Sequence, residues 1–137
     1  MRRLILVSAV VLGACAATPA ERERGAAVRS EEQAGLEREL AGLVPGEPSA
    51  CLPEPARVQL SSEVYGSTIV YRQSRDVKYR TDTNGPCGRP GSDDILVTRT
   101  PMARVCRGDI VQTFDRASRF PTGSCALGDF VPYRRPS

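Results

Sequence analysis

The chain lacks the residue types on which many enzymes and metal sites depend. None of its 137 residues is a histidine or a tryptophan, and aromatic residues make up only 5%. Histidine is the most frequent general base and a common metal ligand, so its absence closes both routes. The Gly-x-Ser-x-Gly nucleophile motif and glycine-rich phosphate loops are also missing. The sequence therefore predicts a protein that is not an enzyme and that binds neither a metal nor a cofactor.

Pairs of carboxylates are the remaining candidates for catalysis. Asp93 and Asp94 are adjacent before an apolar run, and Asp109 and Asp115 flank another one. Two carboxylates can cleave a glycosidic bond when they face each other across a cleft. A sheet as small as the one predicted below offers little cleft, so we do not expect these residues to be catalytic.

Long apolar segments are scarce as well. The longest, residues 4–12 if Ser8 is included, is about half of the ~20 residues that a membrane-spanning helix needs. Two arginines precede it and small residues follow, which is the order of a secretory signal. An ordinary signal peptide and a membrane helix are the alternatives, but Leu12-Gly13-Ala14-Cys15 matches the lipobox of bacterial lipoproteins. We predict that residues 1–14 are a lipoprotein signal peptide and that Cys15 is the lipid attachment site.

Lipidation of Cys15 would determine where the protein resides. Two or three acyl chains, such as palmitate, on one residue anchor a protein stably to a membrane. Ala16 follows the cysteine, where an aspartate would retain a lipoprotein at the inner membrane of enteric bacteria. We therefore expect an outer membrane lipoprotein of the bacterial cell envelope that faces the periplasm.

Charge is distributed unevenly along the chain. Residues 16–50 contain four Arg and seven Glu, whereas residues 51–137 contain thirteen Lys or Arg and nine Asp or Glu. The basic residues are scattered and are not interleaved with aromatic ones, which is typical of a solvated surface. The expected partners are the membrane, reached through the lipid anchor, and an envelope protein or cell-wall polymer, but not a nucleic acid.

Four further cysteines predict two disulfide bonds. An even number in an exported chain favours disulfides, and no C-x-x-C pair is present to hold zinc or to catalyse redox exchange. Three pairings are open. We favour Cys51–Cys106, which would fasten the segment before the sheet to a strand, and Cys87–Cys125, which would join two loops.

The region before the first of these cysteines has helical features. Thr18-Pro19-Ala20-Glu21 has the form of a capping box. Leu36, Leu40 and Leu43 share one helical face, so we predict a weak amphipathic helix over about 30–43, with residues 16–29 as a mobile spacer. Residues 15–50 are thus expected to form a lipidated tether that ends in a proline-rich stretch.

Residues 51–137 are expected to form a small disulfide-linked β domain. The predicted class is mainly β with a minor α contribution: a small curled antiparallel sheet or barrel-like domain of about six short strands, with one N-terminal helix and two disulfides. Pro132 places the last strand at a sheet edge. The strands are predicted at 56–60, 64–73, 77–80, 94–100, 105–114 and 130–133.

Several short runs resemble a known group. They are Ser49–Leu52, Asp94–Val97, Val105–Cys106 with Asp109–Val111, and Leu127–Arg135. Over roughly residues 36–136 the chain resembles small lipoproteins of unknown function from sphingomonad-type alphaproteobacteria. The resemblance implies that cysteines matching Cys51 and Cys106 recur more regularly than the other two, which supports their pairing.

Two functions are compatible with these expectations. The first is a membrane-anchored structural or interaction module of the cell envelope, which would use its sheet or an edge strand. The alternative is an inhibitor of a periplasmic or lysozyme-like hydrolase. The basic domain disfavours inhibition of such lysozymes, because they are basic too and the two proteins would repel each other.

Overall fold

The structure is a computed structural model that describes residues 16–53, 60–101 and 103–137. Cys15, the lipobox and most of the strand predicted at 56–60 lie outside the described residues. Within the described part, no helix is both long and apolar enough to cross a membrane. The elements are α1 (Pro19–Leu40), β1 (Val44–Pro45), β2 (Ser61–Tyr65), β3 (Thr68–Arg72), β4 (Val77–Thr83), β5 (Ile95–Arg99), β6 (Ile110–Phe114) and β7 (Pro121–Arg134).

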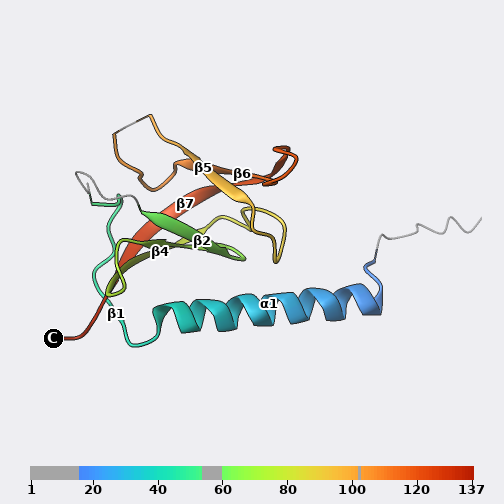
Figure 1. The fold of residues 1–137 in the computed structure, drawn as a ribbon, viewed down its shortest axis with the longest axis horizontal. Helices are drawn as coiled ribbons and strands as arrows, with labels where there is room; N and C mark the ends of the chain where they lie inside the picture. The colour runs from blue at the N-terminus through green and yellow to red at the C-terminus, as the bar shows by residue number, and fades with distance from the viewer. Residues whose placement is uncertain (1–15, 54–59, 102) are drawn as a thin grey trace, which may run out of the picture.

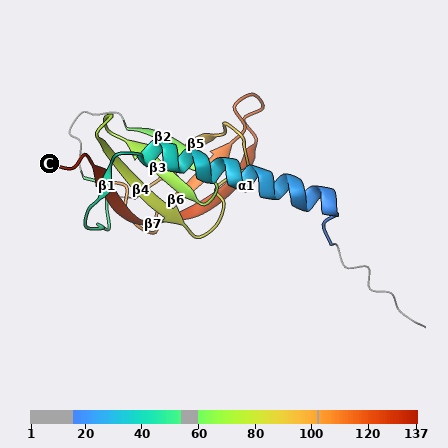
Figure 2. The same cartoon turned by 90° about the horizontal axis from the view of Figure 1, so that it is seen from below.

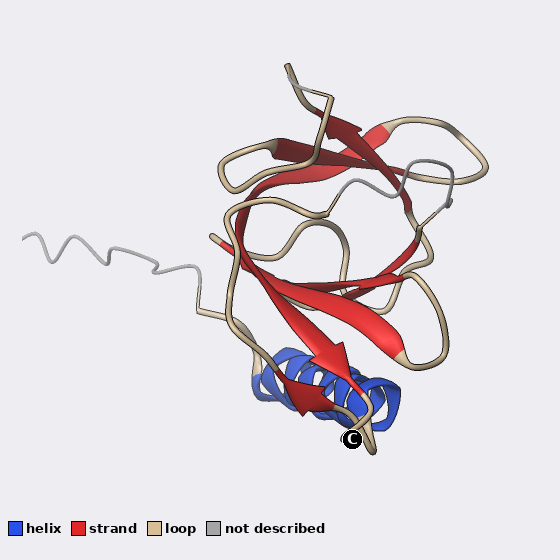
Figure 3. Ribbon diagram, turned by 90° about the vertical axis from the view of Figure 1, so that its left-hand side faces the viewer, coloured by secondary structure: helices blue, strands red, loops and turns tan. Residues whose placement is uncertain are grey.

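The strands form one antiparallel sheet that curls into a half-barrel (Figure 3). Their order is β2-β3-β4-β7-β6-β5, and the two-residue β1 pairs with the free side of β7. Most neighbours in this order are also neighbours in sequence, as expected for hairpin connections. The predicted fold class, a small curled antiparallel sheet with one N-terminal helix and two disulfides, is confirmed.

Strand β7 lies at the centre of the sheet, which corrects the predicted edge position of residues 130–133. It has 14 residues; its first part pairs with β6 and its second part with β4. The carbonyl of Pro132 accepts a hydrogen bond from the Gly46 N–H at 2.7 Å. In an extended strand the nitrogen and carbonyl of one residue point to the same side. The position where other residues carry an N–H therefore points towards the short β1 segment and not towards β4. No hydrogen bond to β4 is lost, so Pro132 is compatible with a central strand.

A glycine allows β7 to approach β4 closely. The pairing of the two strands is irregular between Thr81 and Thr83, opposite the stretch that contains Gly128. A β carbon added to Gly128 would overlap the carbonyl oxygen of Asp82. Gly123 has a similar position, since an added β carbon would lie 2.6 Å from the Cys87 carbonyl oxygen. Only glycine fits where two backbones come this close.

The single strand predicted over 64–73 is in fact a hairpin. β2 and β3 pair through Tyr65 and Thr68, and the chain reverses at Gly66 with a φ of +61°. Glycine adopts this left-handed conformation at little cost. Because the residues on both sides of Gly66 are typical of strands, the sequence pattern predicted one continuous strand instead of two. The predicted turn at 73–76 and the hairpin that follows it are confirmed by the pairing of β3 with β4.

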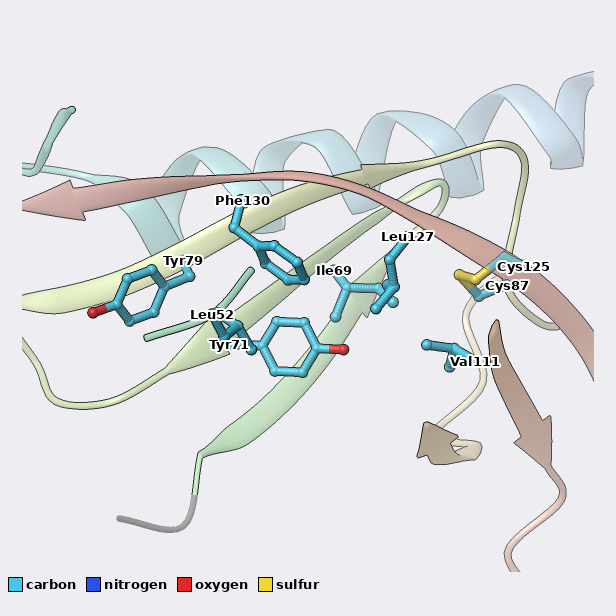
Figure 4. Packing of buried hydrophobic residues seen from close by; sticks show 9 residues of the cluster. All are labelled: Leu52, Ile69, Tyr71, Tyr79, Cys87, Val111, Cys125, Leu127 and Phe130. Carbon is cyan, nitrogen blue, oxygen red and sulfur yellow. A yellow bond between two sulfur atoms is a disulfide. The ribbon is translucent and has the colours of Figure 1, made fainter. Parts of the chain in front are cut away.

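The core fills the concave side of the half-barrel (Figure 4). Phe130, Ile69 and Val111 are fully buried there, and the rings of Tyr71 and Phe130 lie 6.0 Å apart. Core residues are two apart in β3, at Ile69 and Tyr71, as the period of two requires, whereas the irregular pairing of β7 with β4 places Leu127 and Phe130 three apart. The cluster consists of Leu52, Ile69, Tyr71, Tyr79, Cys87, Val111, Cys125, Leu127 and Phe130.

Both predicted disulfides are present, Cys51–Cys106 and Cys87–Cys125. Their surroundings differ from those expected. Cys106 lies before β6 and forms an isolated bridge with Cys51, and Cys125 lies within β7 and not in a loop. Cys87 is fully buried, so this bond anchors the loop before β5 inside the core.

Helix α1 is longer than predicted, because residues 19–29 are helical and not a spacer. The Thr18 Oγ1 accepts a hydrogen bond from the Glu21 N–H at 3.2 Å, and the Glu21 carboxylate accepts one from the Thr18 N–H at 2.6 Å. This capping box begins the helix as the sequence indicated. The cap and the alanines after Gly25 offset the helix-weakening effect of that glycine, about 1 kcal/mol relative to alanine. The helix ends at Leu40, and Gly42, with a φ of +74°, redirects the chain.

Candidate functional site

The residues singled out in the sequence occupy separate places. Cys15 lies outside the described residues, and Cys51, Cys87, Cys106 and Cys125 form the two disulfides. Among the described residues there is no cluster of His, Cys, Asp or Glu that could hold a metal ion.

The carboxylates considered for catalysis stabilise loops instead. Arg89 bridges Asp94 and Asp115, with N–O distances of 2.8 and 2.6 Å. The Arg89 guanidinium, with help from the Thr122 hydroxyl, lowers the pKa of Asp94 to about 2. Backbone N–H groups of Ser118 and Ala117, together with Arg89, lower the pKa of Asp115. Both groups are therefore ionised at neutral pH, whereas a general acid must carry a proton.

Asp93 and Asp109 are also occupied by local contacts. The Asp93 carboxylate accepts a hydrogen bond from Arg116 Nε at 3.0 Å. The Asp109 carboxylate accepts one from the Cys106 N–H at 2.8 Å and so closes the turn that precedes β6. Each carboxylate thus has a structural contact of its own.

A second group of charges joins α1 to the sheet. Glu39, near the end of the helix, accepts hydrogen bonds from Arg72 Nε at 2.5 Å and from Arg72 Nη2 at 2.8 Å. Lys78 Nζ lies 2.8 Å from the same carboxylate. Arg72 and Lys78 lower the pKa of Glu39, and the carboxylates of Glu39 and Glu63 raise the pKa of Arg72. This charge cluster fixes the C-terminal part of α1 on β3 and β4.

A cleft of about 480 Å³ opens beside this cluster. Three segments that are distant in sequence form its walls: the end of α1 with the chain that follows, the turn between β3 and β4, and the C-terminal tail. Figures 1 and 3 show the C-terminus next to the end of α1. The lining residues are Arg38, Glu39, Ala41, Gly42, Leu43, Arg75, Asp76, Lys78, Arg135 and Pro136.

The cleft has a surplus of positive charge. Its lining contains four cationic and two anionic side chains. Four of these six charges are engaged in two pairs, because Lys78 contacts Glu39 and Arg135 Nη2 lies 2.5 Å from Asp76. Within the described part of the chain, Arg38 and Arg75 form no ion pair, and both are exposed. They are the cations of the cleft that remain available to a ligand.

Sequence reasoning did not identify this cleft. It treated the basic residues of 51–137 as a scattered, solvated surface, because Arg75 and Arg135 lie far apart in the chain. The pairing of Val77 with Arg134 brings their two segments together. The sequence predicts a strand that starts at Val77 but does not identify the strand that pairs with it. It therefore does not indicate that Arg135 lies beside the turn between β3 and β4.

Comparisons of the chain with models of protein families, with curated proteins and with solved structures find no match. A function therefore has to be derived from the residues and geometry of this chain.

Proposed function

We propose that the protein is a lipid-anchored interaction module of the bacterial cell envelope, in which α1 is a rigid stalk and the half-barrel is the binding head. The observation that carries this proposal is the position of α1. Its N-cap, Thr18, follows Cys15 after only two residues, so no long flexible linker separates the predicted anchor from the helix.

The stalk would hold the head at a defined distance. A helix of 22 residues is about 33 Å long at ~1.5 Å per residue. Its C-terminal part is bound to the sheet by Glu39 and by the ring of Tyr65, which packs against Gly35. Its N-terminal part projects beyond the sheet (Figures 1 and 2). An anchor at the projecting end would keep the head away from the lipid surface.

The cleft lies at the other end of this arrangement. Figure 1 shows the start of α1 at one end of the molecule, and the end of α1 with the C-terminus at the other. A ligand in the cleft would therefore be bound on the side that faces away from the anchor. This placement supports a role in contacting another envelope component, and it requires no catalysis and no cofactor.

The anchoring step is tested by Cys15→Ala. We expect loss of labelling by a radioactive or clickable fatty acid, accumulation of the unprocessed precursor and release of the head from membrane fractions. Ala16→Ser, which leaves the cysteine intact, is the matched control and should label normally. Unchanged labelling of Cys15→Ala would refute lipidation at this residue.

The interaction role is tested by affinity capture from envelope extracts with the lipidated chain as bait. Recovery of an outer membrane component or a cell-wall polymer supports the proposal. Recovery of a secreted hydrolase as the main partner would contradict it and point to an inhibitor.

A further inference from the structure

We infer that the cleft at the end of α1 binds closely spaced carboxylates of a peptide, as in the acidic peptides of a cell-wall polymer. This inference rests on the envelope location proposed above and names the ligand of that module. Arg38 and Arg75 would provide the contacts, each with one carboxylate.

The two arginines come from different walls of the cleft. Arg38 belongs to the last turn of α1, and Arg75 belongs to the turn between β3 and β4. Lys78 connects these walls, because its Nζ is 2.8 Å from the Glu39 carboxylate and donates a hydrogen bond to the Glu39 carbonyl at 2.5 Å. The arginines are therefore carried by a braced frame, and a ligand need not order the two segments itself.

Carboxylates suit this site better than phosphates do. The helix contributes its C-terminal end, whose partial negative charge opposes a phosphate group of about −1.5 to −2 more than a carboxylate of single charge, whereas phosphate sites typically use the N–H groups at a helix N-terminus. The recognition in the cleft is therefore by side chains alone. Neighbouring arginines already bind carboxylates in this way: Arg72 holds Glu39 through two nitrogens, and Arg135 holds Asp76 through Nε and Nη2. The planar guanidinium matches the geometry of a carboxylate.

The size and lining of the cleft also fit a short peptide. Its volume of about 480 Å³ is within the range of small-ligand sites, about 300–1,000 Å³. Ala41, Leu43 and Pro136 add apolar surface to the charged lining. They can contact the aliphatic parts of a peptide whose carboxylates reach the arginines.

Binding is measured by fluorescence anisotropy with a dye-labelled triglutamate peptide and the purified full chain in nonionic detergent, whether or not Cys15 carries lipid. The uncharged triglutamine peptide is the control, and we expect it to bind about tenfold more weakly or not at all, a difference of one decade in Kd. Raising the salt from about 0.05 to about 0.5 M should weaken triglutamate binding, because exposed charges are screened. Equal binding of the two peptides, or of neither, overturns the inference.

Two double variants with the same net charge test whether the peptide binds in the cleft. Arg38→Gln with Arg75→Gln should weaken triglutamate binding about tenfold or more. Arg24→Gln with Arg29→Gln removes the same charge from the exposed N-terminal part of α1 and should leave Kd unchanged. Far-UV circular dichroism and thermal melting verify that both variants fold. Equal weakening by the two variants would mean attraction by net charge and would overturn the assignment to the cleft.

Two further arms identify the source of the carboxylates. Glutarate should displace the labelled peptide more effectively than inorganic phosphate at the same ionic strength; equal displacement contradicts the preference for carboxylates. Isolated cell-wall sacculi should sediment the chain but not the Arg38→Gln, Arg75→Gln variant, and failure to sediment it contradicts the cell-wall assignment. None of these results depends on Cys15, so a failure here is distinct from a failure of lipid labelling.

Discussion

Glu39 and Arg72 are 33 residues apart in the chain, yet two parallel hydrogen bonds join their carboxylate and guanidinium groups. The side chain of Glu39 is only 14% exposed, and that of Arg72 is 32% exposed. The pair links the end of the helix to the sheet at the point where the chain turns towards β1. The orientation of the stalk, and with it one wall of the cleft, depends on this contact.

Replacement of Glu39 by Gln should loosen the helix from the sheet. The amide can accept a hydrogen bond from Arg72 but carries no charge for Arg72 or Lys78, so we expect a loss of about 1–2 kcal/mol in the free energy of unfolding. Glu37→Gln, on the exposed face of the same helix, should change it by less than about 0.5 kcal/mol. Urea unfolding measures both, and hydrogen exchange should show faster exchange in α1 for Glu39→Gln alone.

The same contact predicts a dependence on pH. Arg72 lowers the pKa of Glu39 from its ordinary value of 4.5 in the folded protein. The resulting stabilisation is fully present above that ordinary value and is lost as the pH falls through the lower, folded value. Stability should therefore decrease more steeply with acidification in the natural chain than in Glu39→Gln. Parallel curves of stability against pH would exclude Glu39 as the titrating group.

Two buried tyrosines should respond oppositely to the loss of their hydroxyl groups. The Tyr71 hydroxyl is buried near the Thr98 side chain but forms no hydrogen bond of good geometry within the described part of the chain, whereas that of Tyr79 donates one to Gln73 at 3.0 Å. An unpaired buried hydroxyl costs about 1–3 kcal/mol. We expect Tyr71→Phe to raise the free energy of unfolding by up to about 1 kcal/mol and Tyr79→Phe to lower it by about 1 kcal/mol. Denaturant titration of the two variants compares them directly.

Local patterns in the sequence identified most elements, with two local errors, the missed turn at Gly66 and the helical residues 19–29. The other main errors concern contacts between distant segments. The capping box at Thr18 correctly marked the start of the helix, because both hydrogen bonds lie within four residues. The alternation around Val77 correctly marked β4. The predicted edge position of β7 was wrong. Pro132 is acceptable in a central strand only if the side without an N–H faces a short neighbouring segment. That segment, β1, is almost 90 residues away in the chain, so local sequence patterns do not indicate it.

The same reason explains why the candidate site was not predicted. The residues of the cleft become neighbours only after β4 pairs with β7 and α1 docks on the sheet. The correct disulfide pairing was easier to choose, because four cysteines leave only three possibilities. Arginines offer no such restriction, and 18 of them are present.

Alanine at Gly128 should be strongly destabilising. An added β carbon would overlap the Asp82 backbone in the middle of the sheet, where neither strand can move freely. We expect a loss of about 2–3 kcal/mol in the free energy of unfolding. Gly85→Ala is the matched control, because an added β carbon there meets no atom within 4 Å. That variant should be neutral or slightly stabilising, and similar losses for the two would contradict the close approach of β7 to β4.

The two disulfides allow a comparison of two contributions to the free energy of unfolding, the entropy of loop closure and the burial of the cysteines in the core. Cys51–Cys106 closes a loop of 55 residues and Cys87–Cys125 one of 38. In the loop-entropy model each bond contributes about 4 kcal/mol, and the longer loop contributes only about 0.3 kcal/mol more. Entropy alone therefore ranks Cys51–Cys106 slightly above Cys87–Cys125.

Burial reverses this order. Cys87 and Cys125 belong to the core and are 0% and 4% exposed, whereas Cys51 and Cys106 are half-buried. Replacing the core pair by alanine also leaves a cavity, which should add about 1–2 kcal/mol to the loss. We therefore expect Cys87→Ala with Cys125→Ala to be less stable than Cys51→Ala with Cys106→Ala in urea unfolding. Equal losses, or a larger loss for the Cys51–Cys106 pair, would show that loop entropy outweighs core packing in this sheet.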